Sequence, residues 1–184
     1  MNQNIRIVEN PQALARTAAA GFLRCAMAAV QRNGRFSVAL SGGSTPKALY
    51  SLLATDPALK RDLPWGKTHV FWGDERPVPP DHADSNFRMA HEALLSKVPV
   101  PAANVHRIAG ELAAEQAAAD YERTLIDAFE LRDGGLPRFD LALLGLGPEG
   151  HTASLFPGTL ALHEKKRLAV ANWVGKFDSE RITL

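Results

Sequence analysis

The sequence is poor in cysteine: Cys25 is the only one among its 184 residues. One cysteine can form neither an intramolecular disulfide nor a thiolate metal cluster, and this usage is typical of the reducing cytoplasm. Cys25 lies among alanines in a predicted helix, so we expect a buried, unreactive thiol rather than a nucleophile. The cysteine content therefore predicts a cytoplasmic protein.

An excess of either charge is also lacking. The 21 Lys and Arg residues and 20 Asp and Glu residues give a formal net charge of +1, and no basic run occurs. This balance argues against a nucleic acid partner. The apolar stretch at 18–30 is too short to span a membrane and contains Arg24, so we expect no membrane partner. A bound anion is then expected to be small and held in a local pocket.

Strand-like and helix-like segments alternate along the chain. Apolar runs predict strands at 36–40, 69–73 and 139–144, with weaker ones at 5–8, 105–108 and 168–173. Helices are expected over 12–31, 46–53 and 113–130, and over a segment capped by Ser85 that runs to about Lys97. This alternation predicts a single α/β domain over 1–184, with a three-layer, Rossmann-like, mostly parallel sheet covered by helices on both faces.

The loop Ser41–Pro46, with the sequence SGGSTP, stands between a predicted strand and a predicted helix that Thr45 is expected to cap. Glycines let the backbone approach an anion closely, and the free amides of a helix start attract negative charge. The hydroxyls of Ser44 and Thr45 add donors. Phosphate binding and an ordinary strand-to-helix turn are both open here, but a P-loop is excluded because its Lys-Ser/Thr pair is absent.

The segment Gly73–Arg76, with the sequence GDER, directly follows another predicted strand. Two acids and an arginine at the carboxyl end of a strand can anchor sugar hydroxyls and clamp an anion. The alternative is a solvated cluster whose charges pair with one another. Its position, equivalent to that of the SGGSTP loop, favours a functional role.

The segment Gly145–Gly158, with the sequence GLGPEGHTASLFPG, is the most informative stretch. A predicted strand runs into a glycine-rich bend and then an expected helix start, which puts His151 at the sheet edge where α/β folds bind ligands. Imidazole is the side chain best suited to proton transfer near neutral pH. The segment therefore predicts a catalytic loop.

Three other chemistries are disfavoured by the same sequence. The bend matches the dinucleotide pattern G-x-G-x-x-G, but Asn172 stands where the acid that follows about 20 residues later is expected. No G-x-S-x-G segment is present, which argues against a serine hydrolase. The remaining histidines lack metal-like spacing, so no metal site is predicted.

Together these segments resemble the 6-phosphogluconolactonase family. The matches, in the family's order, are SGGSTP, GDER with SNFRMA after it, PVPAANVHRI and FDLALLGLGPEGHTASLFPG. The resemblance implies a fold like that of glucosamine-6-phosphate and ribose-5-phosphate isomerases. It also implies a cofactor-independent hydrolase that opens 6-phospho-D-glucono-1,5-lactone to 6-phospho-D-gluconate in the oxidative pentose phosphate pathway.

The resemblance also suggests roles for individual residues. His151 is the expected general base, and Glu149, where the family more often has aspartate, is expected to orient it. Backbone amides of the glycine loop are expected to stabilise the oxyanion. The candidate substrate-binding residues, most of them expected to hold the phosphate, are Gly42, Gly43, Ser44, Thr45, Asp74, Arg76, Gly150, Lys176 and Arg181.

Two alternatives remain for the function. A glucosamine-6-phosphate deaminase needs an acid five residues after the histidine, and Phe156 occupies that position. The other alternative is a non-catalytic sugar-phosphate-binding domain. The presence of His151 as the expected base, and the lack of a helix-turn-helix segment before the domain, favour an enzyme over this alternative.

The resemblance further implies elements beyond Leu184, which leads to the hypothesis that this chain exposes a sheet edge and is a monomer or weak homo-oligomer.

Overall fold

A parallel sheet with the strand order β2-β1-β4 forms the centre of the fold. The computed structural model describes residues 5–132 and 134–184, and the strands of this sheet are β1 (Phe36–Leu40), β2 (Thr68–Trp72) and β4 (Leu141–Ala142). Strand β1 pairs with β2 along its whole length, from Phe36 opposite Thr68 to Leu40 opposite Trp72. All five residues of β1 are buried, as expected for a strand covered on both faces.

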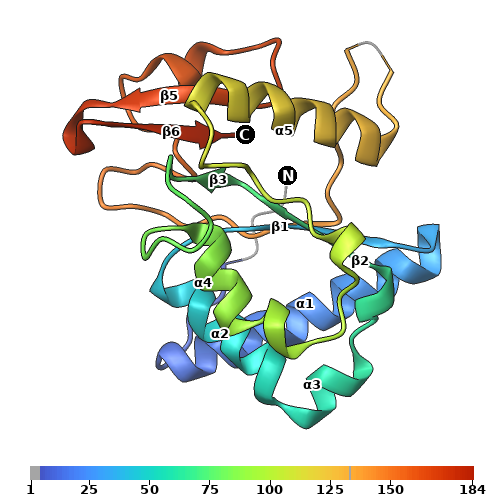
Figure 1. Cartoon of the computed structure of the whole chain (residues 1–184). Helices are drawn as coiled ribbons and strands as arrows, with labels where there is room; N and C mark the ends of the chain where they lie inside the picture. The colour runs from blue at the N-terminus through green and yellow to red at the C-terminus, as the bar shows by residue number, and fades with distance from the viewer. Residues whose placement is uncertain (1–4, 133) are drawn as a thin grey trace.

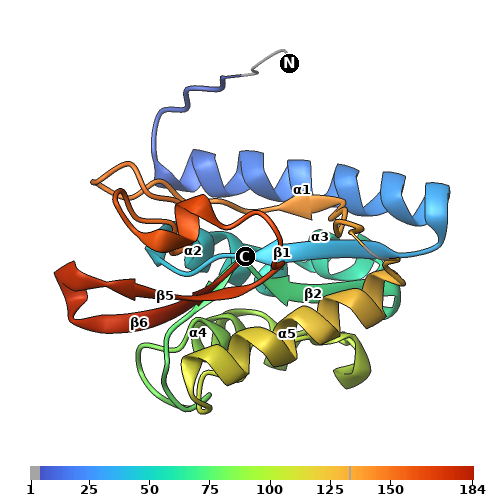
Figure 2. The same ribbon diagram turned by 90° about the horizontal axis from the view of Figure 1, so that it is seen from above.

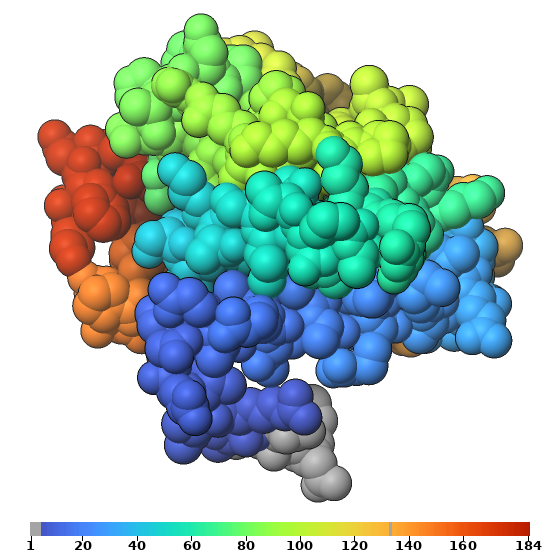
Figure 3. Space-filling model, turned by 90° about the horizontal axis from the view of Figure 1, so that it is seen from below, coloured from blue at the N-terminus to red at the C-terminus, as the bar shows by residue number. Residues whose placement is uncertain are grey.

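Helices cover both faces of this sheet. They are α1 (Pro11–Asn33), α2 (Ser44–Thr55), α3 (Pro57–Asp62), α4 (Asn86–Ala93) and α5 (Ala114–Phe129). Helix α5 lies on one side of β1 and β2, and α1 lies on the other in both Figure 1 and Figure 2. Figure 3 shows α1, the α2–α3 segment and the α4 region side by side on one surface. The predicted three-layer α/β architecture is confirmed.

A second, antiparallel sheet extends from the first. Its order is β3-β6-β5, with strands β3 (Asp74–Glu75), β6 (Ser179–Thr183) and β5 (Val170–Val174). Only Gly73 separates β2 from β3, so the second sheet begins at the carboxyl end of the first. The hairpin of β5 and β6 is thereby held beside the edge where ligands bind in α/β folds.

Several predicted boundaries are wrong. Residues 5–8 form no strand, and of residues 105–108 only Val105 pairs, in an isolated bridge with Val70. The strand expected at 139–144 is reduced to β4, because only Leu141 and Ala142 pair with β1. The helix start expected after the glycine bend is also absent, since the next helical element is a 3₁₀ turn at Leu160–His163.

Helix α1 bears on the expectation about membranes. The whole helix, which extends beyond the apolar stretch at 18–30, is long and apolar enough, by length and composition alone, to cross a membrane, so the length of that stretch does not decide the question. In the fold, Ala19, Phe22, Ala26 and Ala29 are buried, and the helix packs on α2 and β1. Cys25 is half-buried on this helix rather than fully buried.

Two histidines pack together near the start of β2, away from the glycine loops. His69 Nδ1 lies 3.2 Å from His106 Nε2, and the ring of His106 stacks on Phe71 with centroids 4.4 Å apart. Burial, followed by the positive charges of His69 and Arg35, lowers the pKa of His106 to about 4. The neutral form of His106 is therefore the one that the folded state favours.

This histidine pair predicts a pH dependence of stability. An unfolded histidine titrates near pH 6.5, so the unfolded chain binds the proton more readily, and the stability due to neutral His106 is lost as pH falls from about 6.5 to 4. From pH 7 to pH 5, the unfolding free energy of the wild type should fall by about 1 kcal/mol more than that of His106→Gln, after allowance for solvent screening. Urea unfolding at both pH values measures this, and equal losses in the two proteins would contradict it.

Candidate active site

Three of the segments singled out in the sequence meet at one cavity of about 310 Å³. They are the loop that follows β1, the segment that follows β2, and the glycine-rich loop that follows β4. Parallel strands bring their carboxyl ends to the same edge of a sheet, which explains why these distant segments converge. Seven of the predicted site residues line this cavity: Gly42, Gly43, Ser44, Thr45, Asp74, Arg76 and His151.

A second cavity, of about 520 Å³, adjoins the first. The two share Asp74, Arg76, His151 and Ala153 in their walls, and the second adds Arg181 from β6. Burial and then the neighbouring charge of Arg76 lower the pKa of Arg181, although Asp74 and Asp84 act against this. Two guanidinium groups that repel each other across a cavity favour the binding of an anion between them.

The N-terminus of α2 opens onto the first cavity. The helix starts at Ser44 with Gly43 as its N-cap, so the prediction that Thr45 caps it is wrong. Gly43 has φ of 109°, a conformation that glycine adopts without strain. Ser44 and Thr45 therefore lie in the first turn, which contains no acidic residue. The positive end of a helix dipole and two hydroxyls are thus presented to the cavity.

The ring of His151 is held between two neighbours. It stacks on Phe156 with ring centroids 3.9 Å apart and an interplanar angle of 24°. On Gly147, a Cβ would lie 2.6 Å from His151 Nε2 and closer still to Cε1, so the ring occupies the space that a side chain at residue 147 would need. The His151 side chain is only 19% exposed. Its orientation is therefore fixed by packing.

Glu149 contacts one nitrogen of this ring and a lysine. Its Oε2 lies 3.1 Å from His151 Nδ1, and its Oε1 pairs with Lys176 Nζ. The hydrogen bond from Lys176, then one from the backbone, lowers the pKa of Glu149, with His151 a smaller cause. A carboxylate at Nδ1 favours the tautomer with the proton on Nδ1, which leaves the lone pair of Nε2 free to accept a proton.

Three predicted site residues, Glu149, Gly150 and Lys176, lie outside both cavities. Lys176 is paired with Glu149 and lines neither cavity, nor does Gly150. Gly150 has φ of 79°, and its N–H donates to the carbonyl of Gly147 at 2.9 Å. The N–H of Gly147 donates in turn to the His151 carbonyl at 2.8 Å. These two amides shape the bend and are already hydrogen-bonded.

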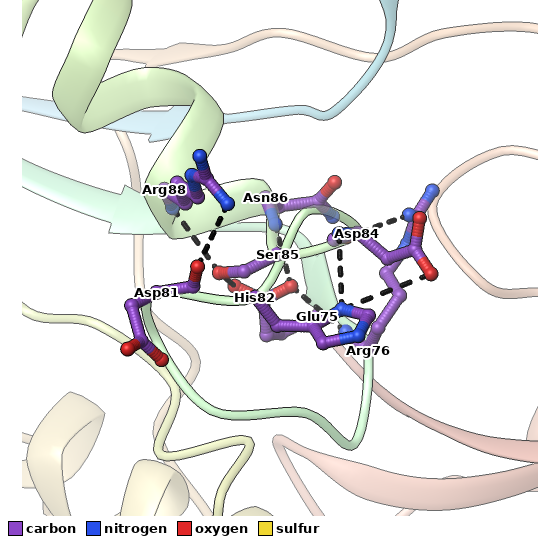
Figure 4. A network of polar contacts seen from close by, with 8 residues as sticks. All are labelled: Glu75, Arg76, Asp81, His82, Asp84, Ser85, Asn86 and Arg88. Atoms are coloured by element: carbon purple, nitrogen blue, oxygen red, sulfur yellow. Dashed lines mark hydrogen bonds and ion pairs between the residues drawn. The ribbon is translucent and has the colours of Figure 1, made fainter.

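Glu75 belongs to a network of polar contacts between β3 and the start of α4 (Figure 4). The buried carboxylate accepts hydrogen bonds from the backbone N–H groups of Arg76, Asn86 and Phe87 and from the hydroxyl of Ser85. Burial raises its pKa, which these hydrogen bonds partly offset. Ser85 caps α4 as predicted, by accepting from the N–H of Arg88. Of the two acids in GDER, Glu75 therefore fixes α4 to β3, and only Asp74 reaches the cavities.

Asp74 is buried at the wall shared by the cavities. Its Oδ2 accepts a hydrogen bond from the Ser154 hydroxyl at 2.7 Å, and its Oδ1 one from Asn86 Nδ2 at 3.3 Å. Burial raises the pKa of Asp74, against the hydrogen bond from Ser154 and the nearby charges of Arg76, Arg181 and His151. Asn86 can approach because residue 42 is glycine: a Cβ there would lie 2.6 Å from Asn86 Cγ.

Sequence reasoning missed three polar residues of this site. Asn86 and Thr152 line the first cavity, Ser154 lines the second, and none of them was assigned a role. The hydroxyl of Thr152 is buried and has no hydrogen-bond partner among the described residues. Asn86 lies in the segment SNFRMA, and Thr152 and Ser154 lie in GLGPEGHTASLFPG. Their position beside expected site residues was the signal in the sequence that could have identified them.

The described part of the chain contains no group of three or more His, Cys, Asp or Glu side chains arranged to hold a metal ion. The functional groups in the two cavities include one imidazole, the buried carboxylate of Asp74, the exposed one of Asp84, the Asn86 amide, two guanidinium groups, hydroxyls and a helix N-terminus. This set can bind an anionic, hydroxylated ligand and move a proton.

Comparison with known proteins gives consistent results. Residues 9–184 match the family model described as glucosamine-6-phosphate isomerases/6-phosphogluconolactonase. A 6-phosphogluconolactonase from Synechocystis is 50% identical over 153 residues, which cover 83% of this chain and 60% of that protein. A chloroplastic 6-phosphogluconolactonase from Arabidopsis thaliana is 44% identical over 160 residues, with 83% and 49% covered.

Solved structures show the same likeness. The 6-phosphogluconolactonase of Trypanosoma brucei superposes with a TM-score of 0.87 at 31% identity, covering 100% of this chain and 76% of that one. The enzyme of Thermotoga maritima gives a TM-score of 0.81 at 32% identity, with 97% and 75% covered. The chain spans 60% and 62% of the length of the two cyanobacterial relatives that it matches.

Proposed function

Because the chain belongs to the glucosamine-6-phosphate isomerase/6-phosphogluconolactonase family, we propose that it hydrolyses 6-phospho-D-glucono-1,5-lactone to 6-phospho-D-gluconate. The observation that carries this proposal is the environment of His151. Its ring lines both cavities and Glu149 engages its Nδ1, so Nε2 is available as a base beside a site suited to an anion. This reaction serves the oxidative pentose phosphate pathway and, in this proposal, needs only water as a second reactant.

The proposed reaction begins with proton transfer to Nε2 of His151 from a water molecule. The resulting hydroxide attacks the lactone carbonyl carbon, C1, and the carbonyl oxygen becomes an oxyanion. The bond between C1 and the ring oxygen then breaks, and the ring oxygen takes the proton from the imidazolium to become the hydroxyl at C5. Glu149 stabilises the imidazolium while it exists, because a carboxylate at Nδ1 favours the charged ring.

The oxyanion needs a hydrogen-bond donor. Backbone amides of the glycine loop were the expected donors, but those of Gly147 and Gly150 already donate within the loop. Thr152 is the better candidate, since its buried hydroxyl lines the same cavity as His151 and lacks a partner among the described residues. One donor aimed at an oxyanion typically contributes roughly 10²- to 10³-fold to the rate.

The phosphate is proposed to bind between the N-terminus of α2 and Arg76. The Gly42–Thr45 turn offers free amides and hydroxyls, and Arg76 stands in the walls of both cavities. Arg76 Nη1 donates to the carbonyl of Asp84 at 2.9 Å, which leaves its Nε as a buried donor without a partner among the described residues. Arg181 adds positive charge from the second cavity, and Asp74 is suited to accept hydrogen bonds from sugar hydroxyls.

A glucosamine-6-phosphate deaminase is less well supported. Phe156 stacks on the His151 ring at the sequence position where that reaction requires an acid, so no carboxylate from this position can assist ring opening.

A cytoplasmic location stays a prediction, because the Arabidopsis relative is named as chloroplastic.

The direct test is a coupled assay with freshly generated lactone. Formation of 6-phosphogluconate is followed through its dehydrogenase, and the spontaneous opening rate is subtracted. The proposed function predicts turnover by the wild type well above this background. A folded protein that binds 6-phosphogluconate but shows no turnover would instead be a sugar-phosphate-binding domain.

Arg76→Met tests the phosphate site. Loss of a charged hydrogen-bond donor to a bound anion costs about 1.5–3 kcal/mol of binding free energy. We therefore expect KM for the phosphorylated lactone to rise roughly 10- to 100-fold. Residual hydrolysis of unphosphorylated glucono-1,5-lactone should change much less. Arg88→Met is the control, because Arg88 pairs with exposed Glu92 and lines neither cavity. Equal effects on both lactones would contradict the assignment.

A further inference from the structure

Ala153 has a backbone conformation that alanine seldom adopts. Its φ is 47°, in the left-handed region where the Cβ of any residue except glycine is crowded. Ala153 follows His151 by two residues and lines both cavities. Strained residues of this kind persist only when the surrounding structure holds them, and they cluster at functional sites.

The next residue, Ser154, is hydrogen-bonded through all three of its polar groups. Its N–H donates to Thr183 Oγ1 at 3.3 Å, its hydroxyl donates to Asp74 Oδ2 at 2.7 Å, and its carbonyl accepts from Asn172 Nδ2 at 2.8 Å. The three partners lie on three different strands, β6, β3 and β5. One serine thus attaches the His151 loop to every strand of the antiparallel sheet.

All four residues of this anchor are shielded from water. Ser154 is 1% exposed, Thr183 0%, Asn172 2% and Asp74 8%. A buried hydrogen bond cannot be replaced by one to solvent, so removing either partner leaves an unsatisfied group. The loop that precedes His151 is held separately, by the N–H of Gly147, which donates to the His151 carbonyl at 2.8 Å, and by the close approach of the ring to Gly147.

We propose that Ser154 is a positioning residue for the reaction: by anchoring the strained turn at Ala153 to the antiparallel sheet, it holds His151 and Thr152 in their working orientation. This inference rests on the proposed lactonase function for its kinetic consequence. The anchor itself is a property of the fold and is open to a test that needs no turnover. In this interpretation, the short antiparallel sheet serves to fix the catalytic loop.

The kinetic test uses Ser154→Ala and Thr183→Val, each of which removes one hydrogen bond of the anchor with little change in volume. A misplaced catalytic group can cost up to about 10²-fold, so we expect each variant to lower kcat roughly 10- to 100-fold with KM changed less than about threefold. Ser37→Ala is the matched control, because Ser37 is also buried and donates to an aspartate, Asp140, at 2.8 Å, from the opposite end of β1. It should lose similar stability and keep its kcat.

A thermodynamic cycle tests the anchor without substrate. Glycine relieves the strain at residue 153, so we expect Ala153→Gly to raise Tm by about 2–4 °C in the wild type. In the Ser154→Ala background the turn is free to relax, and the same substitution should raise Tm by less than half as much. The cycle therefore measures whether residue 154 enforces the conformation of residue 153.

The outcomes separate the two proposals. Absence of turnover in a wild type that shows the expected coupling of Tm values would overturn the proposed function and leave the anchor standing. Equal Tm shifts in both backgrounds, or an unchanged kcat in both Ser154→Ala and Thr183→Val, would overturn the positioning role. If Ser154→Ala does not fold, the kcat of Thr183→Val and the Ala153→Gly shift measured in the Thr183→Val background, which lacks the anchor bond to the Ser154 N–H, decide the question by the same criteria.

Discussion

His151→Ala is expected to lower kcat for lactone hydrolysis by about 10²- to 10⁴-fold, the usual contribution of a positioned general base. The variant should still bind 6-phosphogluconate, because the anion-binding groups lie on α2 and on Arg76 and Arg181. Loss of kcat with retained binding would identify His151 as a group that acts on the transition state. Single-turnover rates after subtraction of spontaneous opening, together with calorimetric titration of the product, measure both quantities.

His163→Ala is the matched control for this experiment. His163 is exposed on the 3₁₀ turn Leu160–His163 and lines neither cavity, so the variant should match the wild type in both rate and product binding. Turnover of His151→Ala at the wild-type rate would sink the assignment of the base. Loss of product binding together with rate would point to a collapsed site instead, which the melting temperature of the variant would reveal.

The parts of the fold that depend on local sequence were predictable. The run at 36–40 is apolar and bounded by glycines on both sides, and β1 has those limits. Helix α5 was expected over 113–130 and extends over Ala114–Phe129, where Tyr121 and Leu125, four residues apart, are buried. Local periodicity and chain breakers decide such elements, so no knowledge of distant residues was needed.

Strands and side-chain contacts that depend on residues far apart in the sequence were not predictable in the same way. The apolar run at 139–144 becomes a strand only at Leu141–Ala142, because a strand exists only where a neighbour pairs with it. Lys176 was expected to face the phosphate, yet it pairs with Glu149, 27 positions earlier. The longer side chain of Glu149 reaches both Lys176 and His151, which no local pattern indicates.

The buried polar contacts of the site show the same limit. Ser154 and Asp74 are 80 positions apart, and their hydrogen bond forms where the loop after His151 lies against the antiparallel sheet. The sequence indicated both segments as functional but could not show which side chains face the cavities and which face each other. Glu75 and Asp74 are adjacent and chemically alike, yet the pleat of β3 sends only Asp74 to the cavities.

Gly147→Ala is expected to have an effect on kcat approaching that of removing the base. The methyl group would occupy the space of the His151 ring, 2.6 Å from Nε2, and the ring is also confined by its stacking on Phe156. The imidazole must therefore move, and a displacement of about 1 Å costs roughly 10²-fold in rate. The backbone itself tolerates alanine, because Gly147 is absent from the positions with positive φ.

A double-mutant cycle distinguishes this steric mechanism from a general weakening of the loop. In the His151→Ala background the ring is gone, so Gly147→Ala should lower the residual rate no further, and the two substitutions should be strongly non-additive. Gly66→Ala is the control, since a Cβ there meets nothing within 4 Å, and its kinetics should match the wild type. Additive losses would mean that residue 147 matters for the bend rather than for the ring. Non-additivity would establish that this glycine exists to make room for the base.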